Sequence, residues 1–176
     1  MKIYVARHGQ TQWNVQNKVC GMTDVCLTET GKKQAEALAD VVGNYTVDVI
    51  LASPLKRAAE TGQIIAERNN IPIRIEPLLI EQDYGIYEGV DRKDSRFLGN
   101  KRNFAYKYPG GESMMQVAYR IYGLIEKIKT QYQDKNVLLV THGGVCRIIK
   151  TYFEDMTNDE FFYYSSDNCS LEEYEI

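Results

Sequence analysis

The sequence lacks long apolar runs and clustered cysteines. Its first apolar run, Ile3 to Ala6, stops at Arg7 and is shorter than a signal-peptide core of about 7–15 residues, and no later run approaches a membrane span. The four cysteines form no CxxC pair, and a chain of this length has no need of a disulfide framework. We therefore expect reduced thiols and a cytoplasmic protein that is neither secreted nor inserted in a membrane.

An excess of basic residues is missing as well. The formal net charge is −3, whereas a nucleic-acid-binding surface normally presents a basic face or stripe. The sequence also has no glycine loop of the GxxxxGK type, so a kinase or NTPase finds no support. We expect no nucleic-acid partner, and an anionic substrate would have to be bound by locally placed arginines and lysines.

What the chain does contain predicts one domain over residues 1–176, since single domains commonly have about 100–200 residues. Short β-branched runs bounded by polar residues predict strands. They lie at Lys2 to Ala6, Val47 to Ala52, Ile71 to Ile75 and Asn136 to Val140, with a final edge strand within Cys169 to Ile176.

Helical patterns lie between most of these strands. Apolar residues at helical spacing predict helices that start at the cap Thr28, at Ser53-Pro54 as cap and first-turn proline, near Glu112, and after His142. Thr157 with Glu160 offers a capping box for one more short turn. Strands alternating with helices predict an α/β fold, a three-layer α/β/α sandwich whose mostly parallel central sheet has helices on both faces.

Polar side chains follow three of the predicted strands. Arg7-His8 follow the first strand, Ser53 to Arg57 the second, and Thr141-His142 the fourth. Ligands of such sheets bind beyond the carboxyl ends of the strands, so we expect these groups to meet at one edge. His8 and His142 are the only histidines. Either one alone is equally compatible with an ordinary polar residue at a strand end, but together with the arginines they favour chemistry.

Arg7 and Arg57 carry forked donors that match phosphate oxygens, and phosphoryl transfer depends on positioning and charge neutralisation. Arg57 also has a plainer interpretation, as a solvated helix residue paired with Glu60. A metal site of His8, His142 and Glu81 is the rival hypothesis. Flanking arginines would repel a divalent cation there, so we expect no metal and no other cofactor.

Two further positions remain open at this point. Asn14 is either a neutral phosphate donor or a turn residue. A carboxyl group past the third strand would protonate the departing oxygen and then activate water. Position alone does not choose between Glu81, Asp83 and Glu88, and each is also compatible with a surface carboxylate.

The motifs together resemble the histidine phosphatase superfamily, which is also called phosphoglycerate mutase-like. The matching strings are Arg7-His8-Gly9-Gln10-Thr11-Gln12-Trp13-Asn14, Leu27-Thr28-Glu29-Thr30-Gly31, Ser53-Pro54-Leu55-Lys56-Arg57-Ala58-Ala59-Glu60-Thr61, Glu81 to Gly89, Pro109-Gly110-Gly111-Glu112-Ser113 and Val140-Thr141-His142-Gly143-Gly144. The resemblance implies a phosphorylated nucleophile at His8 and a proton donor at Glu81. It also implies a phosphate pocket of Arg7, Arg57, His142, Asn14 and the backbone of Gly143. Gln10 departs from the glutamate that is common in the family.

The resemblance implies a metal-independent phosphomonoesterase that acts on a small phosphorylated metabolite. The alternatives are a phosphoglycerate mutase-type phosphoryl transfer and a non-catalytic phospho-ligand sensor. Residues 86–108 are a candidate lid whose basic excess, Arg92, Lys93, Arg96, Lys101, Arg102 and Lys107, either grips a second anionic group or forms a solvated helical face. The physiological substrate and the oligomeric state, a homo-oligomer included, stay open.

Overall fold

A five-stranded sheet forms the centre of the molecule. The computed structural model describes residues 1–176, and the strand order is β3-β2-β4-β1-β5. The strands are β1 (Lys2–Arg7), β2 (Val49–Ala52), β3 (Ile73–Ile75), β4 (Val137–Thr141) and β5 (Leu171–Glu175). All neighbours are parallel except β5, which runs antiparallel to β1 at the edge. The predicted mostly parallel sheet is confirmed, and the strand ends differ from the predicted ones by at most two residues.

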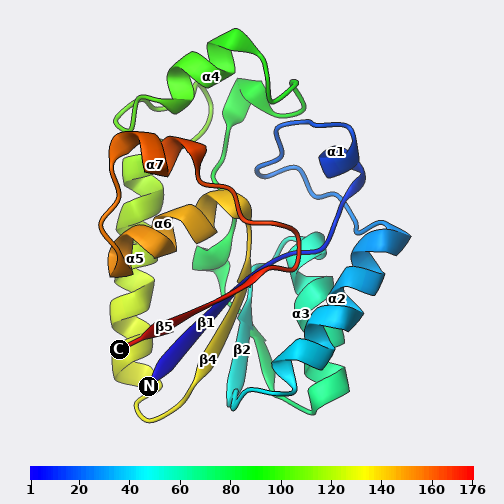
Figure 1. Cartoon of the computed structure of the whole chain (residues 1–176). Helices are drawn as coiled ribbons and strands as arrows, with labels where there is room; N and C mark the ends of the chain where they lie inside the picture. The colour runs from blue at the N-terminus through cyan, green and yellow to red at the C-terminus, as the bar shows by residue number, and fades with distance from the viewer.

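Two layers of helices cover the sheet, as Figure 1 shows. Helices α2 (Glu29–Val42) and α3 (Lys56–Asn69) lie on one face, and α5 (Met114–Gln131) and α6 (Gly143–Phe153) lie on the other. Alternate strand residues point to opposite faces, so Tyr4 and Ala6 enter the core under α2 and α3, whereas Ile3 and Val5 enter the core under α5 and α6. The predicted three-layer sandwich is confirmed.

Local capping explains most helix starts. Thr28 accepts from the backbone N–H of Gly31, and Ser113 forms a capping box with Gln116 at the start of α5. The prediction for α3 was wrong. This helix begins at Lys56, and its N-cap residue Leu55 makes no side-chain cap bond. Ser53 lies before the helix, where its hydroxyl accepts from the Leu55 N–H at 3.4 Å and contacts a histidine ring at 2.7 Å.

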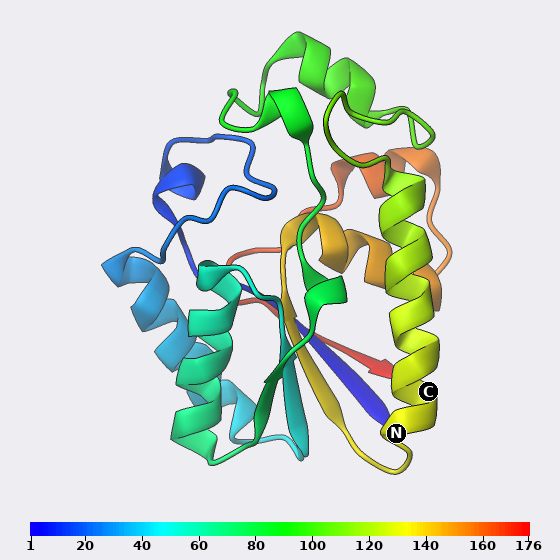
Figure 2. The same cartoon turned by 180° about the vertical axis from the view of Figure 1, so that it is seen from behind.

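Short elements lie above the carboxyl ends of the strands: α1 (Gln12–Val15), the 3₁₀ turns η1 (Pro77–Leu79) and η2 (Gly85–Tyr87), α4 (Ser95–Lys101) and α7 (Asn158–Tyr163). Figure 2 shows the chain rising from β3 through η1 to η2 and α4 at the top. Val19, Tyr87, Phe97 and Tyr108 form a separate small core there. This aromatic cluster holds residues 86–108 against the loop that follows α1.

The cysteines and the helices of the structure bear on the expectations of reduced thiols and of no membrane span. All four cysteines are free thiols: Cys20, Cys26, Cys146 and Cys169. No helix combines the length and the apolar character that crossing a bilayer requires.

Candidate active site

The carboxyl ends of β1, β4 and β2 lie side by side, and the polar groups that follow them meet there. The backbone N–H of His8 donates to the Thr141 carbonyl at 2.9 Å, and the N–H of Ser53 donates to the Val140 carbonyl at 3.0 Å, so strand pairing extends into the site. The rings of His8 and His142 lie 5.2 Å apart, centroid to centroid. The prediction that these distant clusters meet at one edge of the sheet is confirmed.

A cavity that is open to the outside lies at this edge of the sheet. Its polar lining includes Arg7, His8, Asn14, Glu81, Tyr84, Arg92, Lys101, Gly143, Arg147 and Ser166. Arg57 and His142 do not line it, because both are buried behind its surface. No group of three or more histidine, cysteine and carboxylate side chains lies close enough together to hold a metal ion.

The His8 ring is buried, neutral and oriented. Its Nδ1 lies 2.7 Å from the Gly9 carbonyl. A carbonyl only accepts hydrogen bonds, so the proton of the neutral ring lies on Nδ1 and leaves a lone pair on Nε2. Burial, assisted by the charges of Arg57 and Arg7, lowers the pKa of His8 well below its usual value. The ring is therefore held in the form that can act as a nucleophile.

His142 is neutral too, but both of its nitrogens are occupied. Arg57 Nε donates to Nδ1 at 3.2 Å, so the ring proton lies on Nε2, which donates to the Ser53 hydroxyl at 2.7 Å. Burial first, and then the charge of Arg57, lowers the pKa of His142 well below its usual value. The structure thus places His142 as the second ring of a buried network of hydrogen bonds.

Arg57 stands at the centre of that network. Its two terminal nitrogens donate to the carbonyls of Thr23 at 2.9 Å and Gly21 at 2.7 Å. The Glu88 carboxylate holds the same loop, because it accepts from the backbone N–H groups of Gly21, Met22 and Thr23. Only 1% of Arg57 is exposed, so the interpretation as a solvated residue paired with Glu60 was wrong. Glu88 is occupied by this structural role and lies outside the cavity lining.

Glu81 is the carboxylate that the fold brings to the cavity. One oxygen accepts from the N–H of Gly144 at 3.0 Å and the other from the N–H of Gln82 at 2.8 Å. A side chain at Gly144 would place its Cβ 2.5 Å from Glu81 Oε1, so it would displace the Glu81 carboxylate from this position. The Asp83 carboxylate instead accepts from the Gly85 N–H at 2.8 Å and does not line the cavity.

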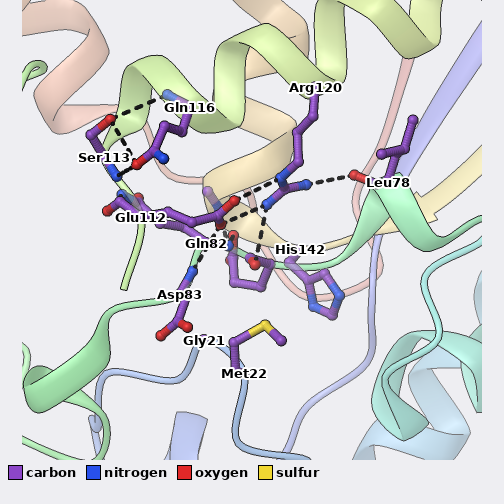
Figure 3. Close-up of polar contacts among 12 residues, drawn as sticks. Gly21, Met22, Leu78, Gln82, Asp83, Glu112, Ser113, Gln116, Arg120 and His142 are labelled. Carbon is purple, nitrogen blue, oxygen red and sulfur yellow. Dashed lines mark hydrogen bonds and ion pairs between the residues drawn. The ribbon is translucent and has the colours of Figure 1, made fainter. Parts of the chain in front are cut away.

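Figure 3 shows how the segment that carries Glu81 is held in place. Arg120 on α5 donates to the carbonyls of Leu78 at 2.5 Å and Glu81 at 3.3 Å. It also pairs with Glu112 at 3.1 Å, and Glu112 in turn accepts from the Asp83 N–H. This arrangement, here called the Arg120–Glu112 clamp, gives the Gly111-Glu112-Ser113 motif a role that the sequence did not reveal.

The remaining anticipated groups line the cavity. Arg7 donates through Nη1 to the Ser166 carbonyl, and its Nε is buried without a partner. The Asn14 side-chain oxygen closes the capping box with Thr11, which leaves its amide N–H groups as the ones available to a ligand. The interpretation of Asn14 as a turn residue is therefore confirmed, and its role as a phosphate donor stays a prediction. Gly143 opens α6, whose N-terminal N–H groups favour an anion.

The sequence missed Arg147, Tyr84 and Ser166 in the cavity wall. Arg147 lies four residues after Gly143 and hence about one turn further along α6. This helical spacing is the signal in the sequence that places Arg147 near the site. The basic residues of the candidate lid divide into two groups. Arg92 and Lys101 line the cavity, whereas Arg96 pairs with Asp94 and Arg102 pairs with Asp159 at the surface.

Comparisons with known proteins agree with this geometry. A model of the histidine phosphatase superfamily (branch 1) matches residues 3–176. The uncharacterized phosphatase PhoE of Bacillus subtilis is 36% identical over 149 residues, which are 85% of this chain and 75% of that protein. Phosphoserine phosphatase 1 of Hydrogenobacter thermophilus is 30% identical over 97% of this chain and 84% of that protein.

Mutases are among the relatives too. A 2,3-bisphosphoglycerate-dependent phosphoglycerate mutase of Cytophaga hutchinsonii is 32% identical over 90% of this chain and 79% of that protein. Among solved structures, mycobacterial glucosyl-3-phosphoglycerate phosphatase superposes with a TM-score of 0.85 at 26% identity, over 98% of this chain and 88% of that one. The fold and the sequence thus point to the same group of proteins.

Proposed function

Because the chain belongs to branch 1 of the histidine phosphatase superfamily, we propose that it is a metal-independent phosphomonoesterase that forms a phosphohistidine on His8. The observation that carries the proposal is the state of that ring. It is neutral, it is held through Nδ1, and it belongs to the cavity wall. Known phosphatases among the relatives support the reaction class.

In the first step, the lone pair of His8 Nε2 attacks phosphorus and the bond from phosphorus to the ester oxygen breaks. Glu81, in its protonated form, gives its proton to that oxygen, and the alcohol leaves. Arg7, the Asn14 amide and the start of α6 bind the phosphoryl oxygens. The bond between His8 Nδ1 and the Gly9 carbonyl stabilises the positive charge that develops on the ring.

In the second step, the ionised Glu81 takes a proton from water, the water oxygen attacks phosphorus, and the bond between phosphorus and Nε2 breaks. Inorganic phosphate leaves, and His8 returns to its neutral form. Arg57 acts from behind the cavity. It holds His142 through Nδ1 and adds positive charge beneath the phosphoryl group.

We expect His8→Ala to abolish phosphate release from a panel of phosphomonoesters assayed in excess chelator. Substrate labelled on phosphorus should transfer its label to the wild-type protein in an acid-labile, alkali-stable form, and His8→Ala should take up none. Tyr119→Ala is a suitable control, because that ring is 86% exposed on α5 and does not line the cavity. Undiminished turnover by folded His8→Ala would overturn the proposal.

The mutase alternative has support from its own relatives. Isomerisation of phosphoglycerate that depends on 2,3-bisphosphoglycerate should be measured beside phosphate release. Faster isomerisation than hydrolysis would favour the mutase. Ligand binding without either reaction would favour the sensor.

A further inference from the structure

Three further cations line the cavity besides Arg7, and none of them has an anionic partner. Arg92 Nε donates to the Lys18 carbonyl at 3.0 Å, Lys101 Nζ to the Phe162 carbonyl at 3.3 Å, and Arg147 Nη2 to the Tyr164 carbonyl at 3.2 Å. A carbonyl orients a cation but does not neutralise it. Arg147 Nε is in addition buried without any hydrogen-bond partner. All three side chains are half-buried, and charges that are withdrawn from water are normally paired, so their lack of an anionic partner needs an explanation.

The position of the three cations suggests an explanation for their missing anionic partners. Arg92, Lys101 and Arg147 also line an outer hollow that shares Tyr164 and Ser165 with the cavity but includes neither His8 nor Arg7. They therefore lie between the reacting centre and the outside. A substrate whose phosphate sits at His8 would extend past them.

The charge of the cavity points in the same direction. Its charged lining consists of Arg7, Arg92, Lys101 and Arg147 against the single carboxylate Glu81. A bound phosphate dianion would leave positive charge over, and Arg57 behind the wall adds more. Burial, followed by the charges of Arg147 and Arg92, lowers the pKa of Lys101 to about 8, as expected where cations crowd together without an anion.

We propose that Arg147, together with Lys101 and Arg92, forms a subsite for a second oxyanion of the substrate, a carboxylate or a second phosphate. The proposal rests on the proposed phosphomonoesterase function and names its substrate class. The substrate is a small phosphomonoester that carries another anionic group and no ammonium group close to it. Arginine suits the task because its planar fork matches a carboxylate or phosphate.

Aromatic packing is the competing explanation for these side chains. Arg147 lies over the Phe161 ring at 5.2 Å and Lys101 over the Phe162 ring at 4.8 Å. If packing were their whole role, removing their charge would change stability and would leave the choice of substrate unaltered. A comparison of matched substrates therefore separates the two explanations.

The test measures kcat/KM for glycerol 3-phosphate, 3-phosphoglycerate and O-phosphoserine in the wild type, Lys101→Met and Arg147→Met. We expect the wild type to prefer 3-phosphoglycerate over glycerol 3-phosphate by at least about tenfold, the lower end of what a hydrogen bond to a charged group contributes. We expect kcat/KM for O-phosphoserine to be lower than kcat/KM for 3-phosphoglycerate, because the three cations would repel its ammonium group. In each variant the ratio of kcat/KM for 3-phosphoglycerate to kcat/KM for glycerol 3-phosphate should fall toward one.

Arg96→Met is the matched control. It removes one positive charge from the same helix as Lys101, but Arg96 is exposed and pairs only with Asp94. It should retain the full preference. 2,3-Bisphosphoglycerate as a further ligand distinguishes the two oxyanions: tighter binding than 3-phosphoglycerate assigns the subsite to phosphate, and weaker binding assigns it to carboxylate.

Calorimetric measurement of the binding of the same ligands to His8→Ala tests the subsite without any need for turnover. Equal affinity for 3-phosphoglycerate and glycerol 3-phosphate, or a preference that survives in both Lys101→Met and Arg147→Met, would overturn the subsite. Absence of turnover with a binding preference that depends on Lys101 would instead overturn the proposed function and leave the subsite standing.

Discussion

The floor of the cavity contains a buried cation and its outer wall contains half-buried ones, and the two regions are built differently. In the floor, Arg57 donates to two carbonyls and to His142, which donates to Ser53. In the outer wall, Arg147 and Lys101 have single carbonyl partners and no anion. The difference teaches that the floor is complete before any substrate arrives. The wall, in contrast, gains its missing partners from a ligand.

The comparison between floor and wall can be tested by substitution, and the largest effect is expected at Glu81, which lines the cavity together with His8. We expect Glu81→Gln to lower kcat by about 10²–10⁴-fold, the usual contribution of general acid–base catalysis. The amide keeps the shape but neither gives nor takes the proton. Asp83→Asn is the matched control, since that carboxylate caps the Gly85 N–H outside the cavity. Steady-state kinetics on both variants checks the prediction, and equal kcat values would remove Glu81 from the chemistry.

A smaller effect concerns the Arg120–Glu112 clamp. Arg120→Met should lower kcat by about 10-fold or more with little change in KM, because an error of about 1 Å in a catalytic group costs up to 10²-fold. It should also lower the free energy of unfolding by about 1–3 kcal/mol, since Glu112 and two carbonyls lose their donor.

Arg120→Lys tests whether the clamp positions Glu81 or merely stabilises the fold. Lysine keeps the charge and should restore most of the stability, while its single ammonium group cannot hold both carbonyls as well as Glu112. Thermal unfolding and kcat should therefore recover to different extents. Parallel recovery of both would argue for a purely structural role.

The smallest effect is a pH dependence of the outer wall. Burial and neighbouring positive charge lower the pKa of Lys101 to about 8. Below pH 8 the ammonium is charged and attracts a second anion, and above pH 8 the proton is lost. KM for 3-phosphoglycerate should therefore rise about 3- to 10-fold between pH 7 and pH 9, relative to KM for glycerol 3-phosphate, from the loss of one charged hydrogen bond. The same pH series on Lys101→Met should show no such relative rise.

Much of this molecule was predictable because its signals are local. Short β-branched runs and helical apolar patterns identified the five strands and the main helices, and the rule for carboxyl ends brought His8, Ser53 and His142 together. The start of α3 was mispredicted, since Ser53 lies before the helix and its hydroxyl contacts the ring of His142. A helix cap is readable from neighbouring residues, whereas a bond to a histidine 89 positions away is not.

The sequence by itself determined the sheet, the pair of histidines and arginines at its edge, and the family that these motifs define. Only the tertiary structure showed that Glu81 lines the cavity whereas Asp83 and Glu88 do not. It also revealed that Arg147 lacks an anionic partner, and it divided the basic residues of the segment 86–108 into lining and surface groups. The physical reason is the distance along the chain between the groups that interact. Helix and strand patterns arise from neighbours within a few residues, but the protonation, burial and pairing of a side chain depend on every group that folding brings beside it.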